Sequence, residues 1–298
     1  MIASTQAKQA TNSAATDEYS VSPYSSTDLD AVHALATAVT GSESYPKFLI
    51  AQLADILGPG FLVARDADAR VVGYTVATPH AQIEARGVVL ALVVDKNHAR
   101  VERELVGVAT TYLRGHGCEE IVFAATTAPE ASDDRDDTPA PAGAYRVRQF
   151  TPADLDDVHR VELSAFGSDP YPRLFFLQLA EVLGTGFLVA ERGTGSERRV
   201  VGYLLGVLDM VAPGRGWVMS VAVHALHRGR HVGWQLMEEA ERYFREVGRK
   251  EVQLTVDPDN EVAVELYQHR YYETVYCHDD LHGMKLSRLV MRLRLPVR

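Results

Sequence analysis

A chain of 298 residues is long enough for two domains of ordinary size. Apolar residues at 46% and charged residues at 23% are typical of a globular protein with normal cores. The net charge of −10 comes almost entirely from the first half, so neither half has the basic face that nucleic-acid binding requires. No apolar run approaches the roughly 20 residues that span a bilayer, so we expect no membrane partner.

The N-terminal segment and the cysteines give two further expectations. Residues 1–18 are small and polar and lack the apolar stretch of a signal peptide, which predicts a disordered tail. The two cysteines, Cys118 and Cys277, have no metal-ligand spacing. We therefore expect no metal and a cytoplasmic location, where thiols stay reduced.

In chain order, the main feature is an internal repeat. Tyr45–Arg65 (YPKFLIAQLADILGPGFLVAR) recurs as Tyr171–Glu191 (YPRLFFLQLAEVLGTGFLVAE), with more than half of the positions identical. The match continues on both sides, and the separation between the copies grows in small steps, as insertions in loops would cause. The segment 129–144 is acidic and rich in Pro and Ala, which is typical of a solvated linker. We predict one domain over 19–128 and a second copy over 145–298.

Both copies predict the same elements. The second begins with a strand over Tyr145–Gln149, a helix from an N-cap-like Thr151-Pro152 and a helix over Arg173–Leu183. Next come a hairpin (Gly186–Glu191 and Val200–Leu208), a strand (Trp217–Val223), an amphipathic helix through Leu236–Val247 and a buried strand (Glu251–Val256). The first copy stops near Thr126, whereas the second continues through another helix and further strands. Strands outnumber crossovers, so the predicted class is α/β (α+β), with mixed, mostly antiparallel sheets flanked by helices.

The segment Val218–Ala240 (VMSVAVHALHRGRHVGWQLMEEA) points to chemistry. A strand enters a loop rich in Arg, Gly and His, which leads directly into a helix. Free backbone N–H groups and the positive end of the helix dipole suit a pyrophosphate at such a place. Arg228 and Arg230 add cationic donors. The alternative is a surface turn with two solvated arginines.

A second motif follows in Leu254–Val275, where Asn260 begins a helix. With both motifs, the second copy resembles the GNAT superfamily of N-acetyltransferases. The family loop, Gln/Arg-x-x-Gly-x-Gly/Ala, appears as Arg228–Gly233, and the family's Asn-x-x-Ala-x-x-Leu-Tyr appears as Asn260–Tyr267. The resemblance covers most of Tyr145–Leu295 and is closest to the ribosomal-protein alanine N-acetyltransferase branch.

The resemblance implies acetyl-CoA as co-substrate and a set of residues that hold it. Tyr267 would protonate the departing CoA thiolate; the alternative is that this tyrosine is a core aromatic. Backbone groups of the strand would bind the pantetheine arm, and the loop would cradle the pyrophosphate. The implied cofactor-binding residues are Val221, Ala222, Val223, Arg228, Gly229, Arg230, His231, Val232, Gly233, Trp234 and Asn260.

The chain departs from the family at several positions. His231 replaces the first loop glycine, and Thr255 stands where the branch often has a glutamate base. Leu281-His282 replaces a tyrosine pair that helps to hold the acceptor. The general base is therefore unassigned, and the histidines are candidates only by residue type: His224, His278 and His282. Because an α-amine has a pKa of about 7.8 against about 10.4 for lysine, a site without a base favours a low-pKa amine.

The first copy lacks the cofactor loop. The residues aligned with Arg228–Gly233 are Asn97–Glu102, where both glycines are missing and Glu102 would repel phosphates. No equivalent of Asn260 or Tyr267 follows. We predict a degenerate, truncated pseudo-acetyltransferase domain that keeps its fold.

These observations predict an enzyme that transfers acetyl from acetyl-CoA to a primary amine. A protein N-terminal α-amine or a lysine is the favoured acceptor, and a small-molecule amine is the second choice. The alternative from another class is a non-catalytic acyl-CoA-binding module, which the missing glutamate and His231 favour. The expected partners are acetyl-CoA and the amine acceptor, with no nucleic acid and no membrane.

Overall fold

The computed structural model describes residues 19–41, 44–129, 144–167, 169–193, 195 and 198–296. The predicted tail over 1–18 and nearly all of the predicted linker over 129–144 lie outside the described residues, so the predicted domain boundaries stay predictions. Among the described residues, no helix is both long and apolar enough to cross a bilayer.

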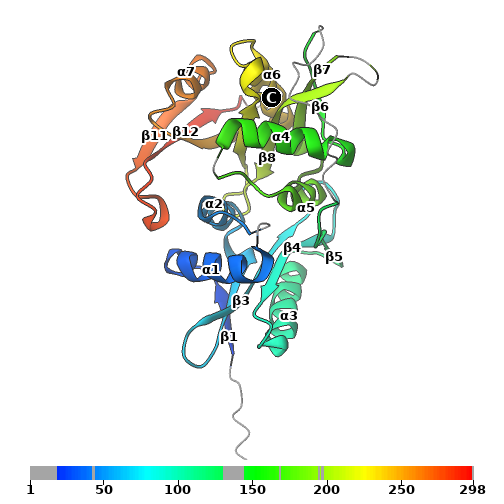
Figure 1. Cartoon of the computed structure of the whole chain (residues 1–298), viewed down its shortest axis with the longest axis vertical. Helices are drawn as coiled ribbons and strands as arrows, with labels where there is room; N and C mark the ends of the chain where they lie inside the picture. The colour runs from blue at the N-terminus through cyan, green and yellow to red at the C-terminus, as the bar shows by residue number, and fades with distance from the viewer. Residues whose placement is uncertain are drawn as a thin grey trace, which may run out of the picture.

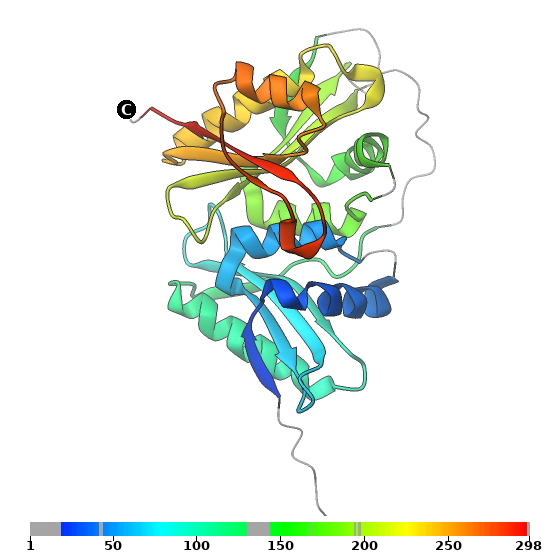
Figure 2. The ribbon, with the colours of Figure 1, turned by 90° about the vertical axis from the view of Figure 1, so that its left-hand side faces the viewer.

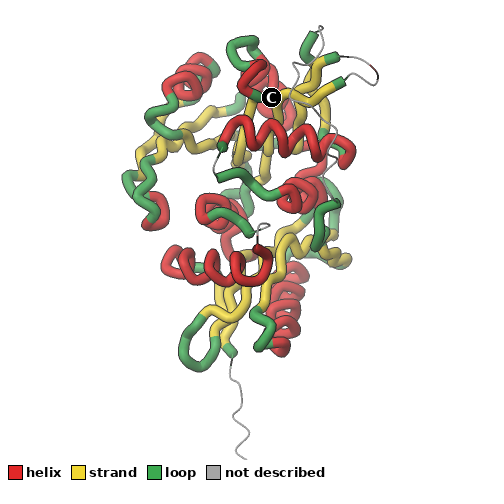
Figure 3. The backbone as a smooth tube through the Cα atoms, in the orientation of Figure 1, coloured by secondary structure: helices red, strands yellow, loops and turns green. Residues whose placement is uncertain are grey.

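The first half of the chain builds a five-stranded sheet in the order β1-β2-β3-β4-β5 (Figures 1 and 3). Only β4 and β5 pair in parallel. Two helices, α1 and α2, cover one face, and α3 covers the other. In chain order the elements are β1 (Ser20–Pro23), α1 (Leu29–Thr40), α2 (Lys47–Leu57), β2 (Phe61–Arg65), β3 (Val71–Pro79), β4 (Arg86–Val94), α3 (Ala99–Gly115) and β5 (Glu120–Phe123).

The second half repeats this order and then extends it to a seven-stranded sheet, β11-β12-β10-β9-β8-β7-β6. Only β9 and β10 pair in parallel. Helices α4 and α5 cover one face, and α6 and α7 cover the other. The elements are β6 (Arg146–Gln149), α4 (Leu155–Phe166), α5 (Arg173–Leu183), β7 (Phe187–Arg192), β8 (Arg199–Leu208), β9 (Arg215–Val223), α6 (Val232–Glu246), β10 (Glu251–Val256), α7 (Glu261–His269), β11 (Glu273–His278) and β12 (Arg288–Arg294).

This architecture confirms the predicted fold class: two mixed, mostly antiparallel sheets, each flanked by helices. The helix predicted over Arg173–Leu183 has the same bounds as α5, and the strand predicted over Glu251–Val256 is β10. The first sheet ends at β5, close to the predicted stop near Thr126, whereas the second gains α7, β11 and β12.

The first helical segment of each half begins with the same aspartate cap, but the arginine that binds this aspartate lies on a different strand in each half. A buried aspartate, Asp28 or Asp154, accepts a backbone N–H at the segment's start, at 2.8 Å in both halves. In the first half Asp28 is bound by Arg65 of β2, and in the second Asp154 is bound by Arg148 of β6. Thr151 is the N-cap, as predicted. The two equivalent buried carboxylates are thus each stabilised by a guanidinium, which comes from the second strand in the first half and from the first strand in the second half.

The two halves share one hydrophobic core. Residues of α1, α2, α4 and α5, together with the inner faces of both sheets, form a single buried cluster. Figures 1 and 2 show α2 and α5 side by side where the halves meet. Because this cluster belongs to both halves, neither half buries that helical face alone, and we expect the described fold to unfold as one unit.

Reciprocal hydrogen bonds cross this core. The Tyr45 phenol donates to Gln178 Oε1, and its counterpart in the repeat, Tyr171, donates to Gln52 Oε1. All four residues are buried. Each glutamine also donates its Nε2 to a backbone carbonyl of the opposite side of the interface. Buried amides whose bonds are satisfied in this way fix the register of the two halves.

Two backbone hydrogen bonds, one donated by each half, also cross the rim of the interface. The N–H of Met210, in the turn after β8, donates to the Ile56 carbonyl of α2 at 3.0 Å. The N–H of Ala81, in the turn after β3, donates to the Val182 carbonyl of α5 at 3.2 Å. The hairpin turn of each half therefore contacts the end of a helix of the other. Figure 2 shows the turn between β11 and β12 beside α2. At this turn His282 Nε2 lies 3.0 Å from Asp55 Oδ1.

Tyr45→Phe should destabilise the whole fold by about 1–3 kcal/mol, because the Gln178 carbonyl loses its donor inside the core. Urea unfolding, followed by tryptophan fluorescence and by circular dichroism, measures this loss. Tyr24→Phe is the matched control, since that buried phenol has no hydrogen-bond partner among the described residues. Equal stability of the two variants, or two separate transitions in either, would contradict the account of a shared interface.

Candidate functional site

A cavity opens between the two central strands of the second sheet, where their pairing stops. β9 pairs with β10 only over Arg215–Val218, opposite Glu251–Leu254. Both strands continue beyond this point, because β9 still pairs with β8 and β10 still pairs with β12. Between the separating strands lies a cavity of about 370 Å³. Two groups of lining residues come from these strands: 218–221 and 254–257.

Beyond Val218, the edge of β9 that faces β10 is open: its backbone groups are not paired with β10. The first carbonyl on that edge, that of Met219, accepts a hydrogen bond of 3.0 Å from Gln52 Nε2. Val221 lies two residues further, so its backbone faces the same edge. The carbonyl of Val223 accepts a bond of 3.2 Å from Arg228 Nε. Of the three predicted pantetheine-binding residues, Val221 is thus the one that lines the cavity, and the carbonyl of Val223 is already used by the loop.

The predicted loop lies between β9 and the start of α6 at Val232. Gly229 and His231 both adopt left-handed backbone conformations, with φ of 71° and 61°. Such a conformation costs a residue with a Cβ roughly 1–2 kcal/mol, which explains why a glycine is expected where His231 stands. A Cβ at Gly233 would meet protein atoms only at ordinary contact distances, 3.5 Å or more. The packing of the protein itself therefore does not require that glycine.

The start of α6 leaves its first N–H groups unpaired toward this loop. The loop side chains Arg228, Arg230 and His231 are exposed around it. His227 differs, because it is buried below the loop with Nδ1 3.1 Å from the Tyr145 hydroxyl. Burial is the main cause that lowers the pKa of His227 to about 4, so it supports the loop as a neutral side chain.

A buried ion pair holds the second motif against the first. Arg270, at the end of α7, binds both oxygens of Glu241 on α6 at 2.8 Å. The same guanidinium lies 4.5 Å from the ring of Trp234 in the first turn of α6. Both motifs are therefore held on one rigid pair of helices, which brings α7 to the side of the cavity.

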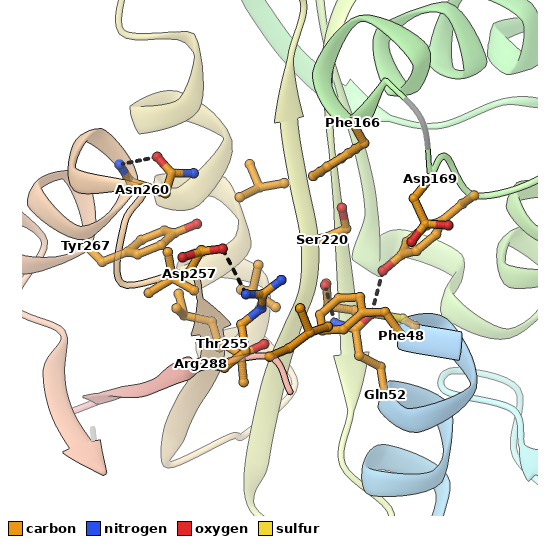
Figure 4. Close-up of a pocket in the computed structure, with 18 of the residues that line it drawn as sticks. Phe48, Gln52, Phe166, Asp169, Ser220, Thr255, Asp257, Asn260, Tyr267 and Arg288 are labelled. Atoms are coloured by element: carbon orange, nitrogen blue, oxygen red, sulfur yellow. Dashed lines mark hydrogen bonds and ion pairs between the residues drawn. The ribbon is translucent and has the colours of Figure 1, made fainter. Parts of the chain in front are cut away.

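Asn260 and Tyr267 both line the cavity (Figure 4). Asn260 is the N-cap of α7, and its Oδ1 accepts the Ala263 N–H at 3.2 Å. Tyr267 is buried, and burial raises the pKa of its phenol well above 10. Figure 4 shows its hydroxyl directed into the cavity. A phenol that stays protonated can donate a hydrogen bond, and then its proton, to an anion that forms nearby.

The cavity also contains residues that the sequence analysis did not select. Phe48 and Gln52 come from α2 of the first half, so the cavity is built by both halves (Figure 4). The Arg288 guanidinium lies 5.1 Å from the centre of the Phe48 ring and 3.0 Å from Asp257 Oδ2. Three carboxyl groups line the cavity together with this one arginine: Glu162, Asp169 and Asp257. Their excess negative charge favours a cationic ligand.

The three histidines named as candidate bases lie outside this cavity lining. The His224 ring accepts the Leu226 N–H within the loop, and His282 binds Asp55 of the first half. That bond is the main cause that raises the pKa of His282. His278 ends β11. Thr255, which replaces the glutamate of the branch, does line the cavity. In the part of the chain that the structure describes, no group of three His, Cys, Asp or Glu could hold a metal.

The first half has a cavity at the corresponding place, beside β4 and β5, but different residues surround it. The residues between β4 and α3 are only Asp95–His98, and Glu102 lies in the first turn of α3. Within described residues 124–129, no helix like α7 follows β5. The lining of the cavity there includes residues of β4, the end of β5, Glu102 of α3 and Gln178 of the second half. Its described lining residues include no equivalent of the loop, the asparagine or the tyrosine of the second half.

Comparisons with known proteins match the second half. Residues 153–272 match the model of the acetyltransferase (GNAT) family. An uncharacterized N-acetyltransferase of Methanocaldococcus jannaschii is 37% identical over 98 residues, which are 33% of this chain and 58% of that protein. The chain therefore spans little more than half the length of that curated relative.

Two solved structures are among the matches. Ard1 from Thermoplasma volcanium is 22% identical with a TM-score of 0.46, over 52% of this chain and 100% of that one. The ribosomal-protein-S18-alanine N-acetyltransferase from Escherichia coli is 14% identical with a TM-score of 0.43, over 52% and 96%. The family match confirms the predicted GNAT resemblance for residues 153–272, the segment that contains the loop, Asn260 and Tyr267.

Proposed function

We propose that the second half transfers an acetyl group from acetyl-CoA to a primary amine. One observation carries this proposal: the cavity between β9 and β10 has the Tyr267 phenol in its wall, and the loop at the start of α6 lies at the end of the same strand β9. Both features fall within the segment that matches the GNAT acetyltransferase family.

Acetyl-CoA would be held by the residues that line this path. The pyrophosphate would lie on the N–H groups from Gly229 to Trp234, with Arg230 as an exposed cationic donor. The pantetheine arm would bond to the free backbone edge at Val221, beside the splayed end of β10. The Asn260 oxygen is used as a helix cap, which leaves the amide NH₂ as the group that it offers to the cofactor.

The acceptor would enter from the side of the first half. Phe48 of α2 and Phe166 of α4 supply rings there, and Asp169 and Glu162 supply carboxyl groups. This lining suits a cationic amine attached to a residue-sized group. A protein N-terminal α-amine or a lysine is our preferred acceptor, of the kind that the ribosomal-protein alanine branch would use. A small-molecule amine is the alternative.

In this proposal the first half is a pseudo-acetyltransferase domain. Glu102 would repel a pyrophosphate at the start of α3, and Asp95–His98 is too short a loop to cradle one. Its contribution is instead the α2 wall of the acceptor cavity and the Gln52 bond that holds Met219 of β9. We also place the protein in the cytoplasm, in keeping with its two free cysteines.

Arg228→Ala combined with Arg230→Ala should weaken acetyl-CoA binding by about 10- to 150-fold, since charge-assisted bonds to phosphate contribute roughly 1.5–3 kcal/mol. The fold should stay intact because both residues are exposed. Isothermal titration measures the affinity. Arg242→Ala, an exposed arginine on the outer side of α6, is the control and should bind like the wild type. Unchanged affinity of the double variant would mean that the loop arginines are only solvated surface residues.

Release of CoA thiol, measured across peptides with free N-termini, lysine peptides, polyamines and small amines, tests the function and ranks the acceptors. Tyr267→Phe should lower turnover on the best acceptor about 100-fold, the lower end for general acid catalysis, because water can partly replace the phenol. Acetyl-CoA affinity should not change, because the phenol acts only as the thiolate leaves.

The Phe variant also separates catalysis from structure. It keeps the ring that packs between α7 and the sheet, so a purely structural tyrosine predicts near-normal turnover with a modest loss of stability. Turnover and melting temperature are therefore measured on one preparation. Acetyl-CoA binding without CoA release for any amine would favour a non-catalytic acyl-CoA-binding module.

A further inference from the structure

A chain of hydrogen-bonded side chains runs from the cavity into the core of the second half. Glu162 of α4 is 1% exposed, and its Oε1 accepts the Tyr171 N–H at 2.8 Å. Its Oε2 accepts the phenol of Tyr203 on β8. The same phenol lies 3.1 Å from the hydroxyl of Ser220 on β9. Ser220 and Glu162 both line the cavity, and Ser220 directly precedes Val221 on the open edge of the strand.

The corresponding positions of the first half do not carry this chain of polar groups. β3 and β4 pair in the same register as β8 and β9, so Tyr74 corresponds to Tyr203 and Ala91 to Ser220. Helices α1 and α4 correspond along their whole length, so Ala36 corresponds to Glu162. Only the tyrosine is common to both halves. The glutamate and the serine occur in the half that has the cofactor loop.

A structural role alone does not account for Glu162. Burying a carboxyl group costs free energy even when it is hydrogen-bonded, and an apolar residue in the same place is often as stable or more so. Ala36 is fully buried at the corresponding position, so this fold accommodates an apolar residue there. We therefore expect the buried Glu162 to lower the stability of the second half, whereas alanine at the same position of the first half has no such cost. This difference indicates a chemical role for the polar residues.

We propose that Ser220, Tyr203 and Glu162 form a proton relay that deprotonates the acceptor amine. This inference rests on the proposed acetyl transfer and supplies the base that the transfer needs. Ser220 Oγ contacts the amine, and Tyr203 and Glu162 act through it, so Ser220 is the residue that touches the substrate.

Each proton in this relay passes from a named donor to a named acceptor. The ammonium group gives a proton to Ser220 Oγ, whose own proton passes to the Tyr203 oxygen, and the Tyr203 proton passes to the Glu162 carboxylate. The neutral amine attacks the acetyl carbonyl carbon, so that the C–N bond forms and the C–S bond breaks. The thiolate takes a proton from Tyr267, and the proton released by the new amide nitrogen restores that phenol. Glu162 later returns its proton to solvent.

The charge state of Glu162 suits this role. Its pKa is raised to about 7, mainly by burial; the bonds from Tyr171 and Tyr203 lower the pKa, and the nearby Asp169 carboxylate raises it. Tyr171 and Tyr203 bind the Glu162 carboxyl directly, and Ser220 is connected to it through the Tyr203 phenol. An α-amine has a pKa of about 7.8, so a proton can move between the two groups at little cost near neutral pH.

The relay is tested by Tyr203→Phe against Tyr74→Phe, two buried tyrosines at the same strand position in the two halves. Tyr203→Phe should lower kcat about 100-fold at neutral pH with the best acceptor, and Tyr74→Phe should not change it. The deficit should shrink as the assay pH approaches the pKa of the acceptor amine, because the amine then arrives neutral. Acetyl-CoA affinity should be the same in both variants.

Ser220→Ala is a second test of the relay in case Tyr203→Phe does not fold. We expect it to fold, because the first half has alanine at the corresponding position. It should show the same pH-dependent deficit, and Glu162→Gln should show it too wherever the protein folds. Wild-type turnover and pH profile in Ser220→Ala would overturn the relay even if the other variants lose stability. Absence of CoA release from the wild type with every amine would instead overturn the proposed function, and the relay with it.

Discussion

The rest of the structure depends on the point where β9 and β10 stop pairing, at Val218 and Leu254. A parallel pair that continued to the end of both strands would leave no room between them and no free backbone edge. Because the pairing stops, β9 presents unpaired backbone groups, its end leads into the loop before α6, and α7 brings Tyr267 to the opposite wall. The cavity, Tyr267 and the loop before α6 therefore all lie along one strand, which is the arrangement that the proposed acetyl transfer uses.

The separated strands need support on their outer side, and the first half provides it. Gln52 binds the Met219 carbonyl at the point where β9 leaves β10, and Tyr171 holds Gln52 in place. Phe48 contacts Arg288, which in turn pairs with Asp257 at the end of β10. The first half, whose turn between β4 and α3 is only Asp95–His98, thus contributes to the cavity of the second half through its helix α2.

Much of the fold followed from local patterns. Period-two strands, the amphipathic helices and the cap at Thr151 are short-range signals, and the internal repeat provided each of them twice. The loop and Tyr267 could be selected as candidates from the sequence because both lie in compact motifs. The left-handed conformation of His231 agrees with the expectation that the position suits glycine.

The composition of the cavity could not be predicted in this way. Phe48 and Gln52 reach it only because the halves pack face to face, and no spacing within α2 indicates that contact. Arg288 lies far along the chain on β12. Glu162 did leave a signal, since it is an acidic residue on the apolar face of α4, where the first copy has alanine. That signal acquires meaning only when the Tyr203 phenol and Ser220 are seen beside it.

We propose that one half holds the cofactor while the other completes its cavity. Isothermal titration of the full chain with acetyl-CoA tests it most directly. We expect one molecule bound per chain, because the first half has Glu102 and a short turn where the second has its loop. A stoichiometry of two would show that the first half also binds the cofactor, and no binding at all would remove the basis for acetyl transfer.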